Sequence, residues 1–184
     1  TRLAVPFLLL RLLWLSRQHG SYRSQTWHRL GFYGRYRASR SGERVWIHAG
    51  SVRETLAIAP FVERLLAERP DLSVLVTSTT PTGAEQVQQK LGGRVEWCWA
   101  PLDTPGAVTH FLERWHSTLG ALVETEIWSN LLTHAAARGV PVVLLNARLS
   151  ERSAARYARV ARLTLQAPGH LVVGGSQTES DASR

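Results

Sequence analysis

The amino-acid sequence predicts an α/β fold in which helices cover both faces of a mostly parallel sheet. Short apolar runs, each the length of one strand, alternate along residues 43–184 with segments of helical periodicity. The apolar runs are nearly continuous, which is typical of strands buried on both faces. A hydrophobic fraction of 44% and a charged fraction of 20% are those of a globular protein, and 184 residues suit one such domain with an appendage.

The first half of this region is predicted to hold three strands, at residues 44–49, 73–79 and 95–100. The sequence there reads RVWIHA, SVLVTST and VEWCWA. A helix is expected at 55–68, with Leu65 and Leu66 facing inward and Pro60 kinking it. A shorter helix at 83–91 then leads to the third strand.

The second half is predicted to add three strands, at residues 121–127, 140–147 and 170–175. Helices are expected at 106–115, at 130–139, where Gly139 closes the last turn, and at 150–167. Strand and helix therefore alternate through the whole region, as a parallel sheet requires.

Residues 1–42 differ from the rest of the chain in charge. Nine of the 22 basic residues and only one of the 14 acidic residues, Glu43, lie within the first 44 positions. Apolar side chains recur there at helical spacing, at Leu3, Phe7, Leu10 and Trp14. This pattern predicts a basic amphipathic helical segment that lies on an anionic membrane surface. The alternative is a helix that packs on its own protein.

The apolar run of this segment does not suit other membrane roles. It is interrupted by Arg11 and, at about a dozen residues, is shorter than the roughly 20 that span a bilayer. No small-residue cleavage site follows it, so a secretory signal is disfavoured. Residues 39–43, SRSGE, read as a linker between a membrane-associating segment, 1–42, and a domain, 43–184. Because that domain is balanced in charge, nucleic acid is the less favoured partner.

Several kinds of site are not supported by the sequence. Cys98 is the single cysteine, so we expect no disulfide, a reducing compartment and a buried strand residue in VEWCWAP. No grouping of His and carboxylate residues has metal-ligand spacing, and we expect no metal and no cofactor. A P-loop and a GxGxxG motif after a strand are also missing. The chain has no Met and begins at Thr1, from which we expect a fragment of a longer protein.

Polar residues follow the carboxyl ends of the predicted strands. In a parallel sheet these ends lie along one edge, where ligands bind. We expect the following side chains to converge there: His48, Ser51, Glu54, Thr80, Asp103, Glu124, Glu126, Asn130, Asn146 and Arg148.

Three carboxylates stand out within this set. Glu124 and Glu126 are two residues apart in a strand and therefore point the same way. They suit one edge of a polar substrate pocket or, alternatively, a structural network that caps helices and bonds to arginine. Glu54 follows Ser51 by three residues, which fits either a helix capping box or a general base at the mouth of the first strand–helix turn.

A family resemblance covers nearly the whole chain. The segments IHAGSVRETLAIAPFVERL, VTSTTPTGAE, APLDTPGAVTHFL, VETEIWSNLL, VPVVLLNARLSERS and SQTESDASR occur in this order and spacing. Together they resemble the amino-terminal half of 3-deoxy-D-manno-octulosonic acid (Kdo) transferases. The combination of TPTG, ETEIW followed by Asn130, and NARLSERS is highly specific.

The resemblance implies a fold, a reaction and a place in the cell. The fold is the first Rossmann-like domain of a two-domain GT-B glycosyltransferase, with the donor-binding carboxy-terminal domain absent from this chain. The reaction transfers Kdo from CMP-Kdo to a lipid A precursor (lipid IVA) in lipopolysaccharide synthesis, with inversion, on the cytoplasmic face of the bacterial inner membrane. We expect this half to bind the acceptor and to be inactive alone.

Site residues are carried over from the family's motifs. Glu54 matches the catalytic base and Glu124 an acid that stabilises the transition state. Acceptor contacts are expected from Ser51, Arg53, Thr80, Thr82, Gly83, Asp103, Glu126, Asn130 and Arg148. Arg53 departs from the family, which has Gly before the base, and a side chain there would crowd a close backbone approach. The alternative is a catalytically silent membrane-surface binding module of the same fold.

Overall fold

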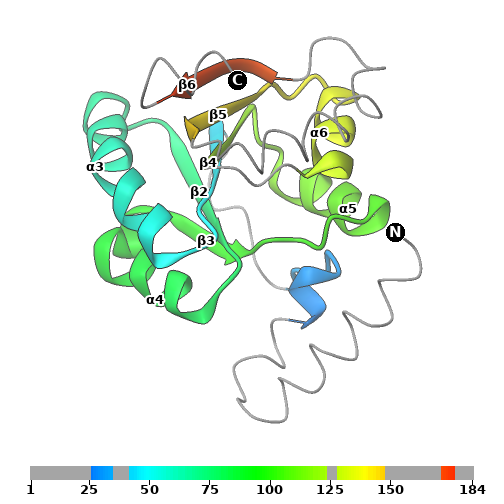
Figure 1. Ribbon diagram of the computed structural model, residues 1–184, viewed down its shortest axis with the longest axis horizontal. Coiled ribbons are helices and arrows are strands. Elements are labelled where there is room, and N and C mark those ends of the chain that lie inside the picture. Colours follow the sequence, from blue (N-terminus) through cyan, green and yellow to red (C-terminus); the bar gives the residue numbers. More distant parts are fainter. Residues whose placement is uncertain (1–25, 35–41, 124–127, 148–170, 177–184) are drawn as a thin grey trace.

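The computed structural model describes residues 26–34, 42–123, 128–147 and 171–176, the last stretch and residues 146–147 by their backbone alone (Figure 1). Six strands pair in parallel in the order β3-β2-β1-β4-β5-β6. They are β1 (Arg44–His48), β2 (Ser73–Ser78), β3 (Glu96–Trp99), β4 (Leu119–Val123), β5 (Val142–Ala147) and β6 (Leu171–Ser176). The predicted Rossmann-like α/β class is confirmed, and the strand order reverses direction between β1 and β4, where such sheets bind ligands.

Helices cover the two faces of the sheet. The described helices are α3 (Val52–Glu68), α4 (Pro81–Lys90), the 3-10 turn η1 (Gly92–Arg94), α5 (Pro105–Trp115) and α6 (Ser129–Ala136). In Figure 1, α3 and α4 lie on one side of the sheet and α5 and α6 on the other. The connections therefore follow the alternation read from the sequence.

Alternate residues of β1 to β5 contribute to two separate hydrophobic cores. In β1, Val45 and Ile47 pack with α3 and α4, whereas Trp46 packs with Phe111 and Trp115 of α5. The Trp46 and Phe111 rings meet edge to face at 5.2 Å. Trp46 is also tied across the sheet by a hydrogen bond from its Nε1 to Thr77 Oγ1 (2.8 Å). The side-chain period of two in a strand explains this division.

Cys98 belongs to the second of these cores, on the α5 side, as expected of a buried strand residue. Burial raises the pKa of its thiol well above the usual value, and the charge of Glu96 adds to the effect. The thiol therefore stays neutral and unreactive at physiological pH.

Some element boundaries differ from those predicted. Helix α3 begins at Val52 and α4 at Pro81, two or three residues early, because Ser51 and Thr80 act as N-caps. Helix α6 ends at Ala136 although Gly139 has the predicted left-handed conformation, with φ of 68°. The turn η1 had no clear signal in the sequence.

Other predictions fall on residues outside the described ranges. They are the amphipathic helix near the amino terminus, the last four residues of the predicted strand 121–127 and the helix at 150–167. Among the residues that the structure describes, no helix has the length and apolarity needed to cross a bilayer.

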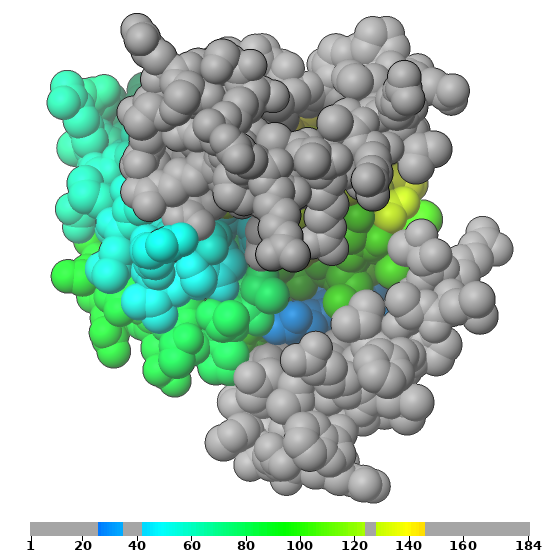
Figure 2. Space-filling model, viewed as in Figure 1, coloured from blue at the N-terminus to red at the C-terminus, as the bar shows by residue number. Residues whose placement is uncertain are grey.

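Residues 26–34 pack on the domain, although the sequence places them in the N-terminal segment. A helical turn at 26–29 leads to Tyr33, whose ring is 3% exposed and lies 5.9 Å from the rings of both Phe111 and Trp115. Figure 2 shows the blue residues of this segment seated against green residues from the middle of the chain. At least this part of the segment is therefore an integral part of the fold.

Gly120 allows the Trp46 ring to approach β4 closely. A Cβ atom at this position would meet Trp46 Cε3 at 2.9 Å and Val142 Cγ2 at 3.2 Å. Because the indole is buried and held by its neighbours, Gly120→Ala is expected to lower the free energy of unfolding by about 1–3 kcal/mol. Urea denaturation checks this. The control is Gly93→Ala, where a Cβ meets open space, and equal losses in both variants would contradict the expectation.

Candidate functional site

Glu54 lies just beyond the carboxyl end of β1, in the first turn of α3. The Gly50 N–H donates to its Oε2 (2.7 Å), and the Ser51 hydroxyl donates to its Oε1 (2.7 Å). The Glu54 N–H in turn donates to Ser51 Oγ (3.4 Å), which caps α3. This is a capping-box arrangement, except that the backbone donor belongs to the residue before the cap. Glu54 is 7% exposed, so its carboxylate is held in one orientation.

The loop after β2 is hydrogen-bonded to the turn that carries Glu54. The carbonyl of Gly50 accepts from the N–H groups of Thr79 (3.3 Å) and Thr80 (3.1 Å) and from Thr80 Oγ1 (3.0 Å). Thr80 also caps α4 by accepting from the Gly83 N–H (3.2 Å). Four of the predicted site residues, Ser51, Glu54, Thr80 and Gly83, are thereby brought together.

Two glycines make this close approach feasible. A Cβ atom on Gly83 would lie 3.1 Å from the Gly50 oxygen and 2.9 Å from Thr80 Oγ1. A Cβ atom on Gly50 would lie 3.1 Å from Thr79 Oγ1 and 3.4 Å from His48 Nε2. A side chain at Gly83 would force Thr80 Oγ1 to shift and would press on the Gly50 carbonyl, whereas one at Gly50 would crowd the Thr79 side chain.

Asp103 and Asn130 form a second group of predicted site residues. The Asp103 carboxylate accepts from the N–H groups of Asn130 (3.2 Å) and Leu131 (2.9 Å), and the Asn130 side chain donates to the Asp103 carbonyl (2.7 Å). A residue 27 positions away thus caps α6, whose own N-cap, Trp128, makes no side-chain capping bond. The main role of Asp103 and Asn130 is therefore to stabilise the start of α6.

The two groups lie at the same edge of the sheet. His48, at the end of β1 and 1% exposed, contacts Thr77 Oγ1 through Nδ1 (3.0 Å). Its ring lies edge-on to Trp128 at the start of α6, with 4.8 Å between ring centroids. The buried imidazole therefore lies between Thr77 of β2 and Trp128 at the start of α6.

The other predicted site residues are either exposed or outside the described part of the chain. Arg53 and Thr82 are exposed, one in the first turn of α3 and the other in the first turn of α4. Glu124, Glu126 and Arg148 lie outside the described residues, as does the side chain of Asn146. Whether Glu124 faces Glu54 therefore stays a prediction.

The Arg53 backbone carries no strain. It is helical, and among the described residues only His116 has a positive φ without being glycine. The side chain points outward, so any crowding by Arg53 would be felt by a bound substrate and not by the protein.

Sequence reasoning missed three contributors to this site. Gly50 supplies both an N–H and a carbonyl to the network, and its place between a buried strand and a helix cap was an available signal. Thr79 packs against Gly50. Arg29, 50 residues before Thr79, donates from Nη2 to the Thr79 carbonyl, and no local pattern points to that contact.

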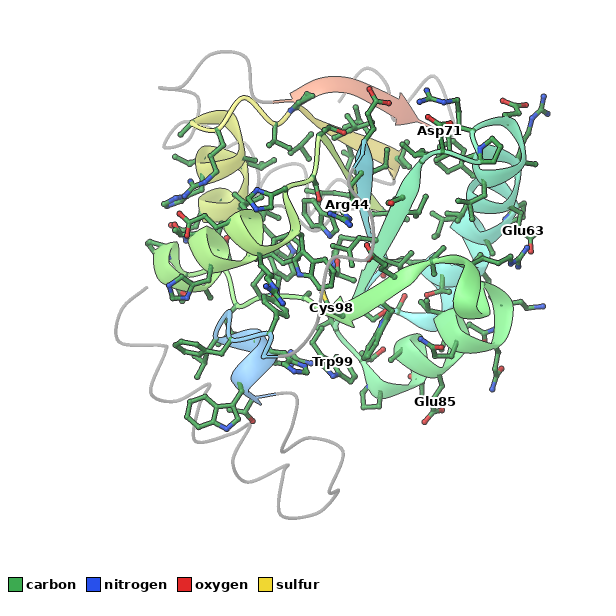
Figure 3. The ribbon with its side chains drawn as sticks, turned by 180° about the vertical axis from the view of Figure 1, so that it is seen from behind. Arg44, Glu63, Asp71, Glu85, Cys98 and Trp99 are labelled. Atoms are coloured by element: carbon green, nitrogen blue, oxygen red, sulfur yellow. The ribbon has the colours of Figure 1, made fainter. Side chains whose placement is uncertain are left out.

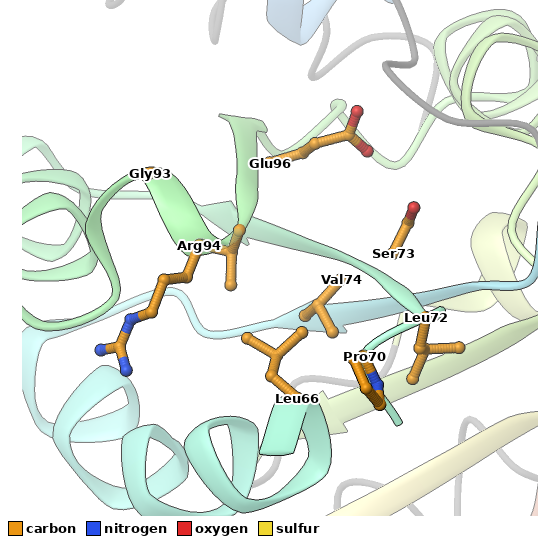
Figure 4. Close-up of a pocket in the computed structure, with 9 residues that line it drawn as sticks. Leu66, Pro70, Leu72, Ser73, Val74, Gly93, Arg94 and Glu96 are labelled. Carbon is orange, nitrogen blue, oxygen red and sulfur yellow. The ribbon is translucent and has the colours of Figure 1, made fainter. Parts of the chain in front are cut away.

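A cavity of about 430 Å³ lies at the other end of the sheet (Figure 4). Ser73 and Val74 of β2 line it, together with the preceding Leu72 and with Arg94 and Glu96. These are the amino ends of β2 and β3, whereas ligands of parallel sheets bind beyond the carboxyl ends. Moreover, Arg94 is bonded to Glu63 (2.9 Å) and Glu96 to Arg44 (2.9 Å), so the charges along its wall are already paired. Within the described ranges no cluster of three or more His, Cys, Asp or Glu side chains could hold a metal ion.

Asp103→Ala should loosen the start of α6. The variant leaves the Asn130 and Leu131 N–H groups without their acceptor, and loss of a cap lowers the free energy of unfolding by about 1–2 kcal/mol. Chemical denaturation measures the loss. Asp71→Ala is the matched control, because Asp71 is exposed and pairs with Arg69, itself exposed. An Asp103 variant as stable as this control would contradict the capping role.

Comparison with known proteins agrees with the resemblance read from the motifs. Residues 24–184 match the family described as 3-Deoxy-D-manno-octulosonic-acid transferase (kdotransferase). The 3-deoxy-D-manno-octulosonic acid transferase of Haemophilus influenzae is 37% identical over 155 residues, which are 84% of this chain and 36% of the relative. That of Bordetella pertussis is 39% identical over 145 residues, 76% of this chain and 33% of the relative.

The chain therefore spans about a third of the length of these curated relatives. A solved structure titled "S. aureus MnaA-UDP co-structure" covers 67% of this chain and 38% of its own, with a TM-score of 0.41 and 19% identity, too distant to inform the function. The family match over most of the chain and the two relatives carry the assignment: this chain belongs to the 3-deoxy-D-manno-octulosonic-acid (Kdo) transferase family.

Proposed function

We propose that this chain is the acceptor-binding half of a glycosyltransferase that moves Kdo from CMP-Kdo to a lipid A precursor such as lipid IVA. The donor would be bound by a further, carboxy-terminal domain of the GT-B type. The observation that supports this most directly is the Glu54 carboxylate, oriented by the Gly50 N–H and the Ser51 hydroxyl at the ligand-binding edge of the sheet.

In this proposal Glu54 is the general base. Oε2 accepts from the Gly50 N–H and Oε1 from the Ser51 hydroxyl, both neutral donors, and a carboxylate has further lone pairs with which to take a proton. Glu54 removes the proton of an acceptor hydroxyl as that oxygen bonds to the anomeric carbon of Kdo. The bond from this carbon to the CMP phosphate oxygen breaks, CMP leaves with the electron pair, and the anomeric configuration inverts.

The remaining residues would bind or stabilise. Glu124 is proposed to stabilise positive charge at the anomeric carbon, and Glu126 and Arg148 to contact the acceptor. Ser51, Thr80, Gly83, Asp103 and Asn130 shape the rim of the acceptor site through the bonds described above, and Thr82 contacts the acceptor from the first turn of α4.

Arg53 stands at the mouth of the site and is proposed to attract an anionic acceptor. Arg53→Ala is then expected to raise the acceptor KM up to about fivefold with little change in kcat, since an exposed ion pair contributes about 1 kcal/mol or less. Steady-state kinetics of the complete protein measure both constants. Arg64→Ala is the control, because Arg64 is an exposed arginine further along α3, paired with Glu68. A fall in kcat alone would refute this role.

The membrane is the proposed place of action. The basic, aromatic and leucine-rich residues that precede the domain are proposed to hold it on the anionic cytoplasmic face of the bacterial inner membrane. This location would bring the site to an acceptor that is itself a membrane lipid.

A second candidate is a membrane-surface binding module that no longer catalyses. Arg53 favours it, because the side chain occupies space that the family leaves open with glycine. A transfer assay separates the two. The complete gene product, incubated with CMP-Kdo and lipid IVA, is expected to add Kdo to the lipid, as mass spectrometry detects. Lipid binding without transfer would support the silent module instead.

A further inference from the structure

Arg29 reaches the candidate site from a segment that precedes the domain in sequence. Its side chain is 8% exposed, and its guanidinium carbon lies 5.5 Å from the centroid of the Trp99 ring. Nη2 donates to the Thr79 carbonyl, beyond the end of β2. Figure 3 shows the blue turn that carries Arg29 beside the labelled Trp99, at the carboxyl end of β3.

Contacts of residues 26–34 with the domain hold Arg29 in this position. The Arg29 carbonyl accepts from the Leu102 N–H (2.7 Å), and the Tyr33 hydroxyl donates to the Trp99 carbonyl (3.3 Å). The rings of His28 and Tyr33 stack on each other with 5.8 Å between centroids, which fixes the segment on both sides of Arg29 in the sequence. Burying a cation without compensating interactions is costly. The burial of the Arg29 guanidinium therefore indicates that its contacts are specific and not those of a loose surface side chain.

The Thr79 carbonyl belongs to the Thr79–Thr80 peptide group, which is hydrogen-bonded to the turn that carries Glu54. The N–H of the same Thr79–Thr80 peptide donates to the Gly50 carbonyl (3.1 Å), and the Gly50 N–H donates to Glu54 Oε2 (2.7 Å). A cation on one end of a peptide group polarises its other end and strengthens the bond made there. Arg29 therefore acts on the Gly50 turn both by fixing the peptide in place and by polarising it.

We infer that Arg29 is a positioning residue for Glu54, acting through the Thr79–Thr80 peptide and Gly50. The inference rests on the proposed function of Glu54. It makes residues 26–34 part of the catalytic apparatus, although they lie outside the domain as the sequence delimits it. Lysine is a poor substitute, because its ammonium lacks the planar fork that both stacks on Trp99 and bonds to a carbonyl.

The test compares Arg29→Gln with the wild type in the complete protein, using CMP-Kdo and lipid IVA. We expect kcat to fall by about 10- to 100-fold, since a small misplacement of a reacting group has effects of that size, while the acceptor KM changes less than about threefold. Arg114→Gln is the matched control. Arg114 also bonds to a backbone carbonyl of the segment, that of Gly34 (3.5 Å), but lies on α5, away from Thr79. It should retain wild-type kinetics.

Two further measurements separate positioning from a loss of stability. Hydrogen exchange of the Thr79 and Thr80 amides should accelerate in Arg29→Gln while that of Ile47 and Val76, in the strands, stays as in the wild type. In a Glu54→Gln background, Arg29→Gln should have no further effect on kcat, because its action passes through the missing carboxylate.

The outcomes keep the two proposals apart. Loss of transfer in Glu54→Gln but not in Arg29→Gln overturns the positioning role alone. A full additional loss in the double variant, or faster exchange throughout the sheet, also overturns it, because either indicates a structural effect independent of Glu54. Wild-type transfer by Glu54→Gln overturns the proposed function itself.

Discussion

Glu54→Gln is expected to lower the kcat of Kdo transfer by about 10²–10⁴-fold, the usual contribution of a general base. Glutamine keeps the shape of the side chain and an oxygen that can still accept from the Gly50 N–H. Its amide can also donate to Ser51 Oγ, so the turn should retain its fold. What is lost is the ability to take a proton from the acceptor hydroxyl. A transfer assay on the complete protein measures the effect.

Glu85→Gln is the matched control for this experiment. Glu85 is an exposed carboxylate on α4, on the same side of the sheet as α3, and lies outside the hydrogen-bond network around Gly50. Its variant should transfer Kdo at the wild-type rate. Equal activity of the Glu54 and Glu85 variants would remove Glu54 from the catalytic role and leave the capping of α3 as its only function.

Phe111→Ala is expected to lower the free energy of unfolding by about 3–5 kcal/mol, the range found when a large aromatic side chain is deleted from a core. Phe111 is fully buried and joins three parts of the molecule. Its ring contacts Trp46 of β1 at 5.2 Å and Tyr33 of the segment before the domain at 5.9 Å. The cavity would therefore affect both the sheet and the packing of residues 26–34.

Phe61→Ala controls for the loss of a phenylalanine as such, because this ring on α3 is 49% exposed. Its removal should affect stability far less. Urea denaturation followed by tryptophan fluorescence gives both values. A similar effect in the two variants would mean that Phe111 is not the central contact of the core on the α5 side.

The order of strands and helices was predictable because it depends on local patterns. Apolar runs and helical periodicity are properties of neighbouring residues, and the N-caps Ser51 and Thr80 act within three residues of themselves. The capping box around Glu54 was likewise visible, since Ser51 and Glu54 are neighbours on the first turn of a helix. Local signals placed the starts of α3 and α4 a few residues late, because caps extend a helix beyond its apolar pattern.

The candidate site was predictable in part. The rule that strand ends share one edge gathered Ser51, Glu54 and Thr80, which the structure joins through hydrogen bonds, and it also included Asp103 and Asn130, which bond to each other. It could not say which of these polar groups are used internally. Each Asp103 carboxylate oxygen accepts from a backbone N–H of α6, a capping role that is set by tertiary contacts and not by residue type.

By itself, the sequence determined the alternation of elements, strands buried on both faces, the capping box at the start of α3, and membership of the Kdo transferase family. Only the tertiary structure decided that Asp103 caps α6, that Gly50 is clasped by the loop after β2, and that Arg29 reaches Thr79. The physical reason is the range of the interactions. Periodicity and capping act between neighbours in the chain, whereas these bonds join residues that approach one another only after the sheet has formed.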